Sequence, residues 1–258
     1  TEFNQGLTLT WDLDQAKLRA ETGTTVKLAG TSSFRELELS TATVNIVSGA
    51  SVTFNQLEMS QGGGGPLSVV NQSGGTVNFT GTNNTNTTSA SFLIGHWGSG
   101  SAATYNLSGG SLNAAGAVMA LGWDSANVNF NQSGGTANFL GINLNNGRDN
   151  TAAYNLTGGR INLGSTGITN ASNKSVNLGG GTVGAFADWS STKNITLTGT
   201  GGATTVNTLD SVDNTTPRTI TLEGVLSGAG GLTQQGDGTL RIENAANSFS
   251  GTVRVEAG

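Results

Sequence analysis

The fold is decided by a short stretch that recurs along the chain, YNLSGGSLN at Tyr105–Asn113. Closely similar stretches are VNQSGGTVN at Val70–Asn78, FNQSGGTAN at Phe130–Asn138 and YNLTGGRIN at Tyr154–Asn162. A shorter fifth copy, VNLGG, begins at Val176. Self-similarity of this kind indicates a repeat architecture, in which each copy is one structural unit that buries its apolar side against its neighbours.

The first asparagine of each copy gives the length of the repeat. It falls at Asn71, Asn106, Asn131 and Asn155, so the spacings are 35, 25 and 24 residues and the regular period is about two dozen residues. Within a copy, apolar and polar residues alternate on both sides of a Gly-Gly pair, which is the pattern of a strand, a turn and a second strand. A period of this length is typical of one coil of a parallel β-helix and is too short for a propeller blade.

We therefore expect an all-β fold, a right-handed parallel β-helix (β-solenoid) of about 10 coils with roughly 20–25 residues each. With strands about 4.8 Å apart, such a rod is roughly 50 Å long. One continuous solenoid is expected, with an N-terminal cap or irregular coils over 1–69, coils of the Asn-x-Ser/Thr-Gly-Gly type over 70–217 and a distinct repeat over 218–258. The segment Leu13–Ala20 fits either a short helix or the continued alternation of a strand.

Stacked coils give the recurring asparagines a structural role. Residues one period apart lie over one another, so side-chain amides in one column can hydrogen-bond from coil to coil. The same argument places Phe130 between Tyr105 and Tyr154 in an aromatic stack that contributes about 0.5–1.5 kcal/mol per contact. The predicted ladder residues are Asn71, Asn106, Asn131 and Asn155 in one column, and Asn113, Asn138 and Asn162 in another.

The spacing of 35 residues is explained by loop insertions within Thr82–Ser91 and around Gly98–Ala102. In solenoids, insertions project from one face that often binds a partner. Trp97 and Trp123 fall near the same turn of successive coils, where they either form an aromatic platform for sugars or pack on each other to shield the coil edge. The candidate ligand-facing residues are His96, Trp97, Trp123, Asn83, Asn84 and Asn86.

Catalytic chemistry is not indicated by any motif, and we expect the chain not to be an enzyme. His96 is the only histidine, and its nearest candidate acid partner is Asp124, about one coil away. The alternatives for His96 are a turn residue packed on Trp97 and an imidazole that faces a ligand.

Acidic residues occur in three close pairs: Asp12 and Asp14, Glu36 and Glu38, and Asp210 and Asp213. Glycoside hydrolysis needs two carboxylates about 5–9.5 Å apart on either side of a cleft, and residues two apart on a strand fit that distance. Ordinary surface strands carry such pairs as well, so the pairs alone do not predict a hydrolase.

Metal ions and cofactors are not expected. The segment Gln235–Leu240, QGDGTL, is superficially similar to a calcium-binding nonapeptide, but such sites need several tandem copies. Asn-x-Ser/Thr triplets, for example at Asn71 and Asn106, arise from the composition of the repeat, and we interpret these asparagines as ladder positions instead of glycosylation sites.

Composition limits the partners of the chain. Among 258 residues, 11 Lys and Arg stand against 16 Asp and Glu, which gives a net charge of −5, and no basic run is present that could bind a phosphate backbone. No apolar run approaches the roughly 20 residues of a membrane helix. The first residues, Thr1–Asn4, do not resemble a signal peptide. We therefore expect neither nucleic acid as a partner nor a membrane span in this chain.

The last forty residues resemble the autotransporter-associated β-strand repeat of bacterial surface proteins. The resemblance lies in LSGAGGL at Leu226–Leu232, GDGTL at Gly236–Leu240, NSFSG at Asn247–Gly251 and the final strand Val253–Gly258, which ends in Ala-Gly. The chain departs from the pattern at Glu243–Ala246, where the family more often has Ser-Gly. The Tyr/Phe-Asn copies look like the modules that precede such repeats, so the two resemblances together cover about residues 70–258.

The resemblance implies an exported β-helix passenger that is displayed at the bacterial cell surface and has roles in secretion and adhesion. We therefore expect an extracellular or cell-surface structural rod that self-associates through its solenoid ends and contributes to a stalk or fibre. Surface glycans are candidate ligands of its loops. The alternative is a β-helix protein that binds glycans or degrades polysaccharides, because fold analogy alone does not assign function.

Overall fold

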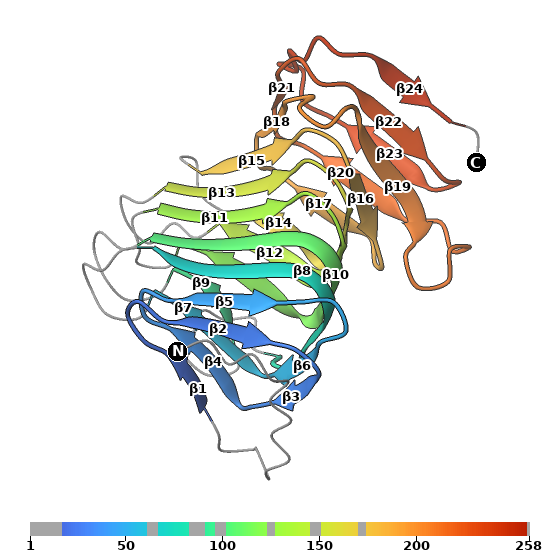
Figure 1. The fold of residues 1–258 in the computed structure, drawn as a ribbon. Coiled ribbons are helices and arrows are strands. Elements are labelled where there is room, and N and C mark those ends of the chain that lie inside the picture. Colours follow the sequence, from blue (N-terminus) through green and yellow to red (C-terminus); the bar gives the residue numbers. More distant parts are fainter. Residues whose placement is uncertain are drawn as a thin grey trace.

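The computed structural model describes residues 17–60, 67–82, 91–95, 102–122, 127–144, 151–169 and 174–256. Within these ranges the chain forms β-strands and no helix, and the strands of successive turns pair in parallel (Figure 1). The strands stack into a β-solenoid, which confirms the all-β parallel architecture predicted from the repeat. None of the described residues belongs to a helix long and apolar enough to cross a membrane.

Each turn of the solenoid contributes strands to three faces, and the first face carries the start of each sequence copy. In Figure 1 this face rises from β2 and β5 through β11 and β13 to β15. Its strands are β2 (Thr25–Leu28), β5 (Thr43–Ile46), the first half of β8 (Ser68–Phe79), the start of β10 (Ala102–Leu121), β11 (Asn127–Gln132), β13 (Thr151–Leu156), β15 (Ser175–Leu178), β18 (Ile195–Leu197) and β21 (Leu226–Ser227).

The second face carries the end of each sequence copy and follows the Gly-Gly corner. Its strands are β3 (Thr31–Ser33), β6 (Ser51–Phe54), the second half of β8, the middle of β10, the first halves of β12 (Thr136–Leu144) and β14 (Arg160–Thr169), then β16 (Thr182–Ala185), β19 (Thr204–Asp210), β22 (Leu232–Gln235) and β24 (Val253–Val255).

The third face closes the turn and consists of two stretches of sheet. The first stretch contains β1 (Lys17–Ala20), β4 (Glu36–Leu39), β7 (Gln56–Met59), β9 (Phe92–Ile94) and the last parts of β10, β12 and β14. The second is a separate three-stranded sheet of β17 (Trp189–Ser191), β20 (Thr219–Leu222) and β23 (Thr239–Ile242). The Ser191 hydroxyl donates to the Ile168 carbonyl of β14 at 2.9 Å, so this second sheet continues the face.

The number of turns is slightly smaller than expected. On the first face, eight successive pairings connect β2 to β21 among the described residues, so the chain makes about eight turns instead of about ten. Within the Asn-Gly-Gly copies the register is the predicted one, because Asn71, Asn106, Asn131 and Asn155 are successive partners.

The Gly-Gly corner between the first and second faces is free of side chains because adjacent coils approach closely there. Gly110 has a φ of +77°, which is costly for other residues. A Cβ atom on Gly110 would also lie 2.2 Å from the Gly75 carbonyl oxygen of the preceding coil. The glycines are therefore required by the distance between coils as well as by the turn.

The core is a continuous column of inward-facing side chains, with an aromatic stack in its middle. The Phe130 ring lies 5.1 Å from the Tyr105 ring and 5.6 Å from the Tyr154 ring, centroid to centroid, and both pairs are stacked. All three side chains are almost fully buried. This arrangement confirms the predicted position of Phe130 between the two tyrosines.

The N-terminal part of the described chain contains strands of the same sheet. β4 and β7 on the third face continue into β9, and β5 on the first face continues into β8. Of the segment Leu13–Ala20, which allowed either a helix or a strand, residues Lys17–Ala20 form strand β1. Residues 13–16 lie outside the described residues.

Candidate functional site

The predicted ligand-facing side chains cannot be placed, because they lie outside the described residues. The same holds for Asp124, the candidate acid partner of the histidine, and for the acidic pair Asp12 and Asp14. The ligand-facing set consists of His96, Trp97, Trp123, Asn83, Asn84 and Asn86. The remaining candidates are the asparagine columns and the acidic pairs of the described chain.

The asparagines of the first face form a ladder of side-chain amides along the rod. In each step, Nδ2 of one asparagine donates to Oδ1 of the asparagine in the preceding coil. Asn106 donates to Asn71 at 2.9 Å, and Asn131 donates to Asn106 at 3.0 Å. The ladder extends beyond the predicted column to Asn45 at one end, which accepts from Asn71 at 3.0 Å, and to Asn177 at the other. The remaining steps are Asn155 to Asn131 at 2.8 Å and Asn177 to Asn155 at 2.7 Å.

A second ladder runs along the second face. Asn113 donates to Asn78 at 3.1 Å, Asn138 to Asn113 at 3.1 Å, and Asn162 to Asn138 at 2.8 Å. It ends at Asn162, because Gly184 occupies the next position and brings no amide. A Cβ atom on Gly184 would lie 2.4 Å from Asn162 Oδ1, so a side chain there would displace the last rung.

The ladders leave some hydrogen-bonding capacity on the outer surface. An amide has two N–H donors and an oxygen with two lone pairs, and the ladder uses one of each. The rungs are half-buried, and the second-face positions two residues before them carry hydroxyl groups, at Ser111 and Thr136 for example. The coils from Val70 to Asn138 therefore display uncharged donors and acceptors at a fixed strand spacing, which suits neutral hydroxyl-rich ligands better than charged ones.

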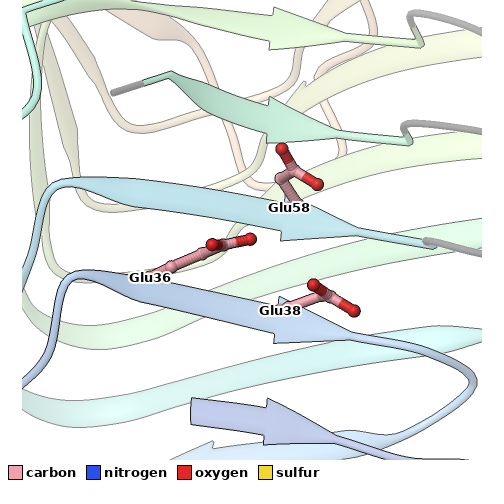
Figure 2. A group of neighbouring side chains, drawn as sticks. All are labelled: Glu36, Glu38 and Glu58. Atoms are coloured by element: carbon pink, nitrogen blue, oxygen red, sulfur yellow. The ribbon is translucent and has the colours of Figure 1, made fainter. Parts of the chain in front are cut away.

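The acidic pair Glu36 and Glu38 is part of a buried polar cluster on the third face. Strand β4 places both side chains over Gln56 and Glu58 of β7, since Glu36 pairs with Gln56 and Glu38 with Glu58 in the register. All four residues are buried, with exposed fractions between 1% and 7%. One carboxylate oxygen from each of the three glutamates lies within 4.8 Å of the others (Figure 2).

Basic side chains compensate this cluster. The Lys17 ammonium contacts Glu36 Oε1 at 3.0 Å and also contacts Glu38, and Arg19 Nε lies 2.8 Å from Glu38 Oε1. Arg35 pairs with Glu36 at 3.3 Å. Burial alone would lower the Lys17 pKa, but the hydrogen bonds to Glu38 and Glu36 outweigh it and hold that pKa above the usual lysine value. Three carboxylates thus face three cations, which is the arrangement of a structural ion cluster.

The three glutamates have the donor set of a hard cation such as Ca²⁺. Ion pairs with Lys17 and Arg19 already occupy Glu38, and Gln56 Nε2 donates to Glu58 Oε1 at 2.6 Å. A cation would have to displace these partners and would meet the positive charge of Lys17. The geometry therefore gives no support to a metal centre, and the burial of Glu36 and Glu38 keeps their carboxylates away from a polymeric substrate.

The second described acidic pair, Asp210 and Asp213, shapes the loop between β19 and β20. Asp210 Oδ2 accepts from the Arg218 guanidinium, with Nε at 2.8 Å. Asp213 Oδ1 accepts from the backbone N–H groups of Thr215 and Thr216, each at 2.8 Å. Hydrogen bonds from the Thr216 hydroxyl and backbone hold the Asp213 pKa well below its usual range. Both carboxylates therefore stabilise the loop.

The calcium-like segment Gln235–Leu240 is explained by packing. A Cβ atom on Gly238 would lie 2.2 Å from the Arg218 carbonyl oxygen, and one on Gly236 would lie 2.9 Å from Leu209 Cγ. Asp237 is exposed, and within the described part of the chain it belongs to no group of three or more candidate metal ligands. The glycines of this segment thus serve the stacking of coils.

The cluster of Glu36, Glu38 and Glu58 was only partly visible in the repeat search. The stretches FRELELS at Phe34–Ser40 and FNQLEMS at Phe54–Ser60 are themselves a repeat with a spacing of 20 residues, at positions 34 and 54. This shorter period differs from that of the Asn-Gly-Gly copies. Aligning these two stretches would have placed Gln56 over Glu36 and Glu58 over Glu38.

Comparisons with models of protein families, with curated proteins and with solved structures find no match for this chain.

Proposed function

We propose that this chain is a non-enzymatic extracellular structural protein, a right-handed β-solenoid rod that forms part of a bacterial surface stalk or fibre by end-to-end stacking and carries adhesive loops. The observation that carries the proposal is the uninterrupted stack of parallel coils. Backbone pairing runs through every described turn, and two side-chain ladders reinforce its middle. The right hand follows the general preference of parallel β-crossovers.

The roles of the acidic residues support a structural function over a hydrolytic one. Glu36 and Glu38 are held in buried ion pairs, and Asp210 is held by Arg218. A hydrolase needs two carboxylates that can reach a sugar chain from both sides. These described pairs instead hold strands and a loop in place.

The residues that resemble the autotransporter-associated repeat have physical roles in the last coils. Asn247 Oδ1 accepts from the Leu226 backbone N–H at 2.7 Å and so connects two coils. A Cβ atom on Gly251 would lie 2.2 Å from the Gly230 backbone, so this corner needs glycine as the Asn-Gly-Gly corner does. The motif is thus a coil-stacking motif, which is consistent with the surface-displayed rods that the resemblance implies.

Strand β24 provides a surface for end-to-end stacking. Val253 and Val255 are 51% and 74% exposed, although Leu232, the partner of Val253 in the preceding coil, is 1% exposed. Their inward positions would be covered by one more coil. The free edge of β24 can also pair with another strand, which is how exposed sheet edges associate.

Electron microscopy and sedimentation velocity of the purified chain over a range of concentrations test the proposal. We expect particles that lengthen with concentration along the rod axis. Val255→Lys places a charge at the end of the rod and is expected to abolish lengthening while the circular dichroism spectrum stays that of a β-protein. Val212→Lys is the matched control, because Val212 is 82% exposed and lies in the loop between β19 and β20. Equal behaviour of both variants and the parent chain would contradict end-to-end stacking.

The adhesive part of the proposal is tested by glycan binding. A glycan array combined with an assay for reducing ends measures binding and hydrolysis together. We expect saturable binding without release of new reducing ends, and a loss of binding in Trp97→Ala. Release of reducing ends by the chain would replace the structural function with the polysaccharide-degrading alternative.

A further inference from the structure

Two glutamines lie in the apolar interior of the solenoid at equivalent positions. Gln72 and Gln132 each follow a ladder asparagine on the first face and point inward, with exposed fractions of 0% and 1%. Neither belonged to the predicted ladders. A buried amide is costly unless its oxygen and nitrogen find partners, so the surroundings of these two side chains must supply them.

Both glutamines find their partners in the coil that follows. The Tyr105 hydroxyl donates to Gln72 Oε1 at 2.7 Å, and Gln72 Nε2 donates to the Ser111 carbonyl oxygen at 2.9 Å. The Tyr154 hydroxyl donates to Gln132 Oε1 at 2.8 Å, and Gln132 Nε2 donates to the Arg160 carbonyl at 2.8 Å. In both cases the accepting carbonyl lies six residues after the tyrosine, so the two arrangements are copies of each other.

The intervening coils have apolar residues at both positions. Leu107 takes the place of glutamine in the coil of Tyr105, and the next coil presents Phe130, which has no hydroxyl. Leu156 takes that place in the coil of Tyr154, and the next coil presents Val176. In these coils, glutamine is therefore followed by tyrosine, and leucine by a residue without a hydroxyl group.

We propose that the buried Tyr–Gln pairs determine which coil stacks on which, and so act as register keys of the solenoid. The copies beginning at Tyr105, Phe130 and Tyr154 are similar enough that the chain could stack the third on the first and loop out the second. In that arrangement Tyr154 would lie over the coil of Leu107, and its hydroxyl would be buried without an acceptor. The native order is the one that satisfies both tyrosines.

General physical chemistry favours a role in register over a role in stability. A buried polar pair contributes little net stability compared with apolar residues of the same size, whereas a mismatched one is strongly unfavourable. Buried polar residues are best attested as devices that select one register. Burial also raises the pKa of Tyr154 well above its usual value, which keeps its hydroxyl protonated as a donor.

The absence of cysteine from the sequence allows the register to be read by engineered disulfides. Asn129 and Ala153 are partners in adjacent strands, so the pair Asn129→Cys and Ala153→Cys reports the native order. Thr104 and Ala153 lie two coils apart, because Asn129 is the partner of both. At about twice the 4.8 Å strand spacing, they exceed the roughly 7 Å limit for a disulfide, so the pair Thr104→Cys and Ala153→Cys reports a skipped coil.

The experiment refolds both cysteine reporters from denaturant under oxidising conditions and measures the fraction of each disulfide. With the parent sequence we expect the native disulfide and almost no skipped one. Tyr154→Phe removes the mismatch from the skipped order and leaves Gln132 Oε1 without its partner in the native order. The ratio of skipped to native disulfide should rise by about tenfold, as expected for one buried hydrogen-bonding group that changes sides.

A matched control separates register from stability. Phe130→Leu weakens the stack in the same column without changing a polar pair, and it should lower the unfolding midpoint while the disulfide ratio stays at the parent value. If Tyr154→Phe does not fold, Gln132→Leu combined with Tyr154→Phe carries the test, since neither order then leaves a polar atom unpartnered and skipping should increase. Parent-like disulfide ratios in these Tyr154 variants would overturn the proposal.

Discussion

The coils between Val70 and Asn162 and the coils after Ser175 belong to one solenoid but use asparagine differently. In the earlier coils, each ladder asparagine donates to the same residue of the coil before, as Asn131 does to Asn106. In the later coils, asparagine oxygens accept from backbone N–H groups instead. Asn194 accepts from Val225 at 2.9 Å, and Asn247 accepts from Leu226 at 2.7 Å.

The difference shows what sequence repetition provides. An amide can both donate and accept, so a column of identical amides satisfies itself wherever coils of equal length repeat the same residue. After Asn177 the next residue in the first-face column is Thr196, and the ladder stops there. Without the repeated partner, an asparagine satisfies the backbone of its neighbour, which is a local solution that needs no repetition.

The cores of the two regions differ in the same way. The earlier coils contain the stacked rings of Tyr105, Phe130 and Tyr154. The later coils are filled by branched aliphatic residues and one large ring, Trp189, and they enclose a small apolar cavity of about 10 Å³ beside Val206. Like residues in successive coils pack well because each copy presents the same shape to the next, whereas unlike residues leave gaps.

The largest expected effect is the loss of a ring from the aromatic stack. Phe130→Ala is expected to lower the free energy of unfolding by about 4 kcal/mol, because it removes a fully buried ring and leaves a cavity. Ile195→Ala, in the same inward column of the later coils, should cost less by about the 0.5–1.5 kcal/mol of each lost ring contact. Chemical denaturation of both variants measures this difference, and equal losses would show that stacking adds nothing to burial.

Removal of a buried glutamine is expected to have the next largest effect. Gln72→Leu leaves the Tyr105 hydroxyl buried without an acceptor and should cost about 1–3 kcal/mol. Gln234, in the later coils, is only half-buried and donates to the Gly236 carbonyl at 2.6 Å, so water can replace it in Gln234→Leu. We expect a loss below about 1 kcal/mol there, as for most substitutions away from buried polar networks. A similar loss in both variants by thermal denaturation would contradict the distinction.

The ladder itself is tested by exchange of one amide for a carboxylate. Asn131→Asp removes the donor to Asn106 Oδ1 and should cost about 1–2 kcal/mol at neutral pH. Asn194→Asp keeps the oxygen that accepts from Val225 and should change stability by less than about 0.5 kcal/mol. Protonation of the carboxyl introduced by Asn131→Asp restores a donor, so the loss should shrink as the pH falls through the pKa of that carboxyl. Denaturation at neutral and acidic pH measures both effects, and an equal cost at the two sites would show that the ladder is not stabilising.

The smallest effect is expected at the cavity of the later coils. Val206→Ile adds a methylene group beside the cavity and should stabilise the chain by about 0.5 kcal/mol, less than the value for full burial of that group. Val77→Ile, in the same inward column of the earlier coils, should destabilise it, because overpacking a filled core costs about 1–3 kcal/mol. Opposite signs in thermal denaturation are the expected outcome. Stabilisation by both variants would show that the earlier core is also underpacked.

Sequence reasoning succeeded where the repeat is regular. The asparagine columns and the position of Phe130 between two tyrosines follow from the period alone, since one coil spacing places like residues over each other. It counted about two coils too many because the coils of the last part are longer and less similar. From Ile195 to Leu226, for example, one turn takes 31 residues, from position 195 to position 226.

The buried polar groups were harder to predict. Gln72 and Gln132 occupy a position where other copies have leucine, so they read as variation within the repeat instead of partners for the tyrosines of the next coil. The cluster of Glu36, Glu38 and Glu58 followed a shorter period than the one that guided the search. Both features depend on which side chains meet across coils, and a single copy does not contain that information.

The sequence by itself determined the coil, because alternation defines which residues point inward and the Gly-Gly pair defines where the chain can turn. It also determined the amide columns, because identical residues at one period must stack. Only the tertiary structure decided the third face, the ion cluster of Lys17 with Glu36 and Glu38, and the Tyr–Gln pairs. These arise from contacts between coils of unequal length, whose register is set by the packing of the whole stack and not by any local pattern.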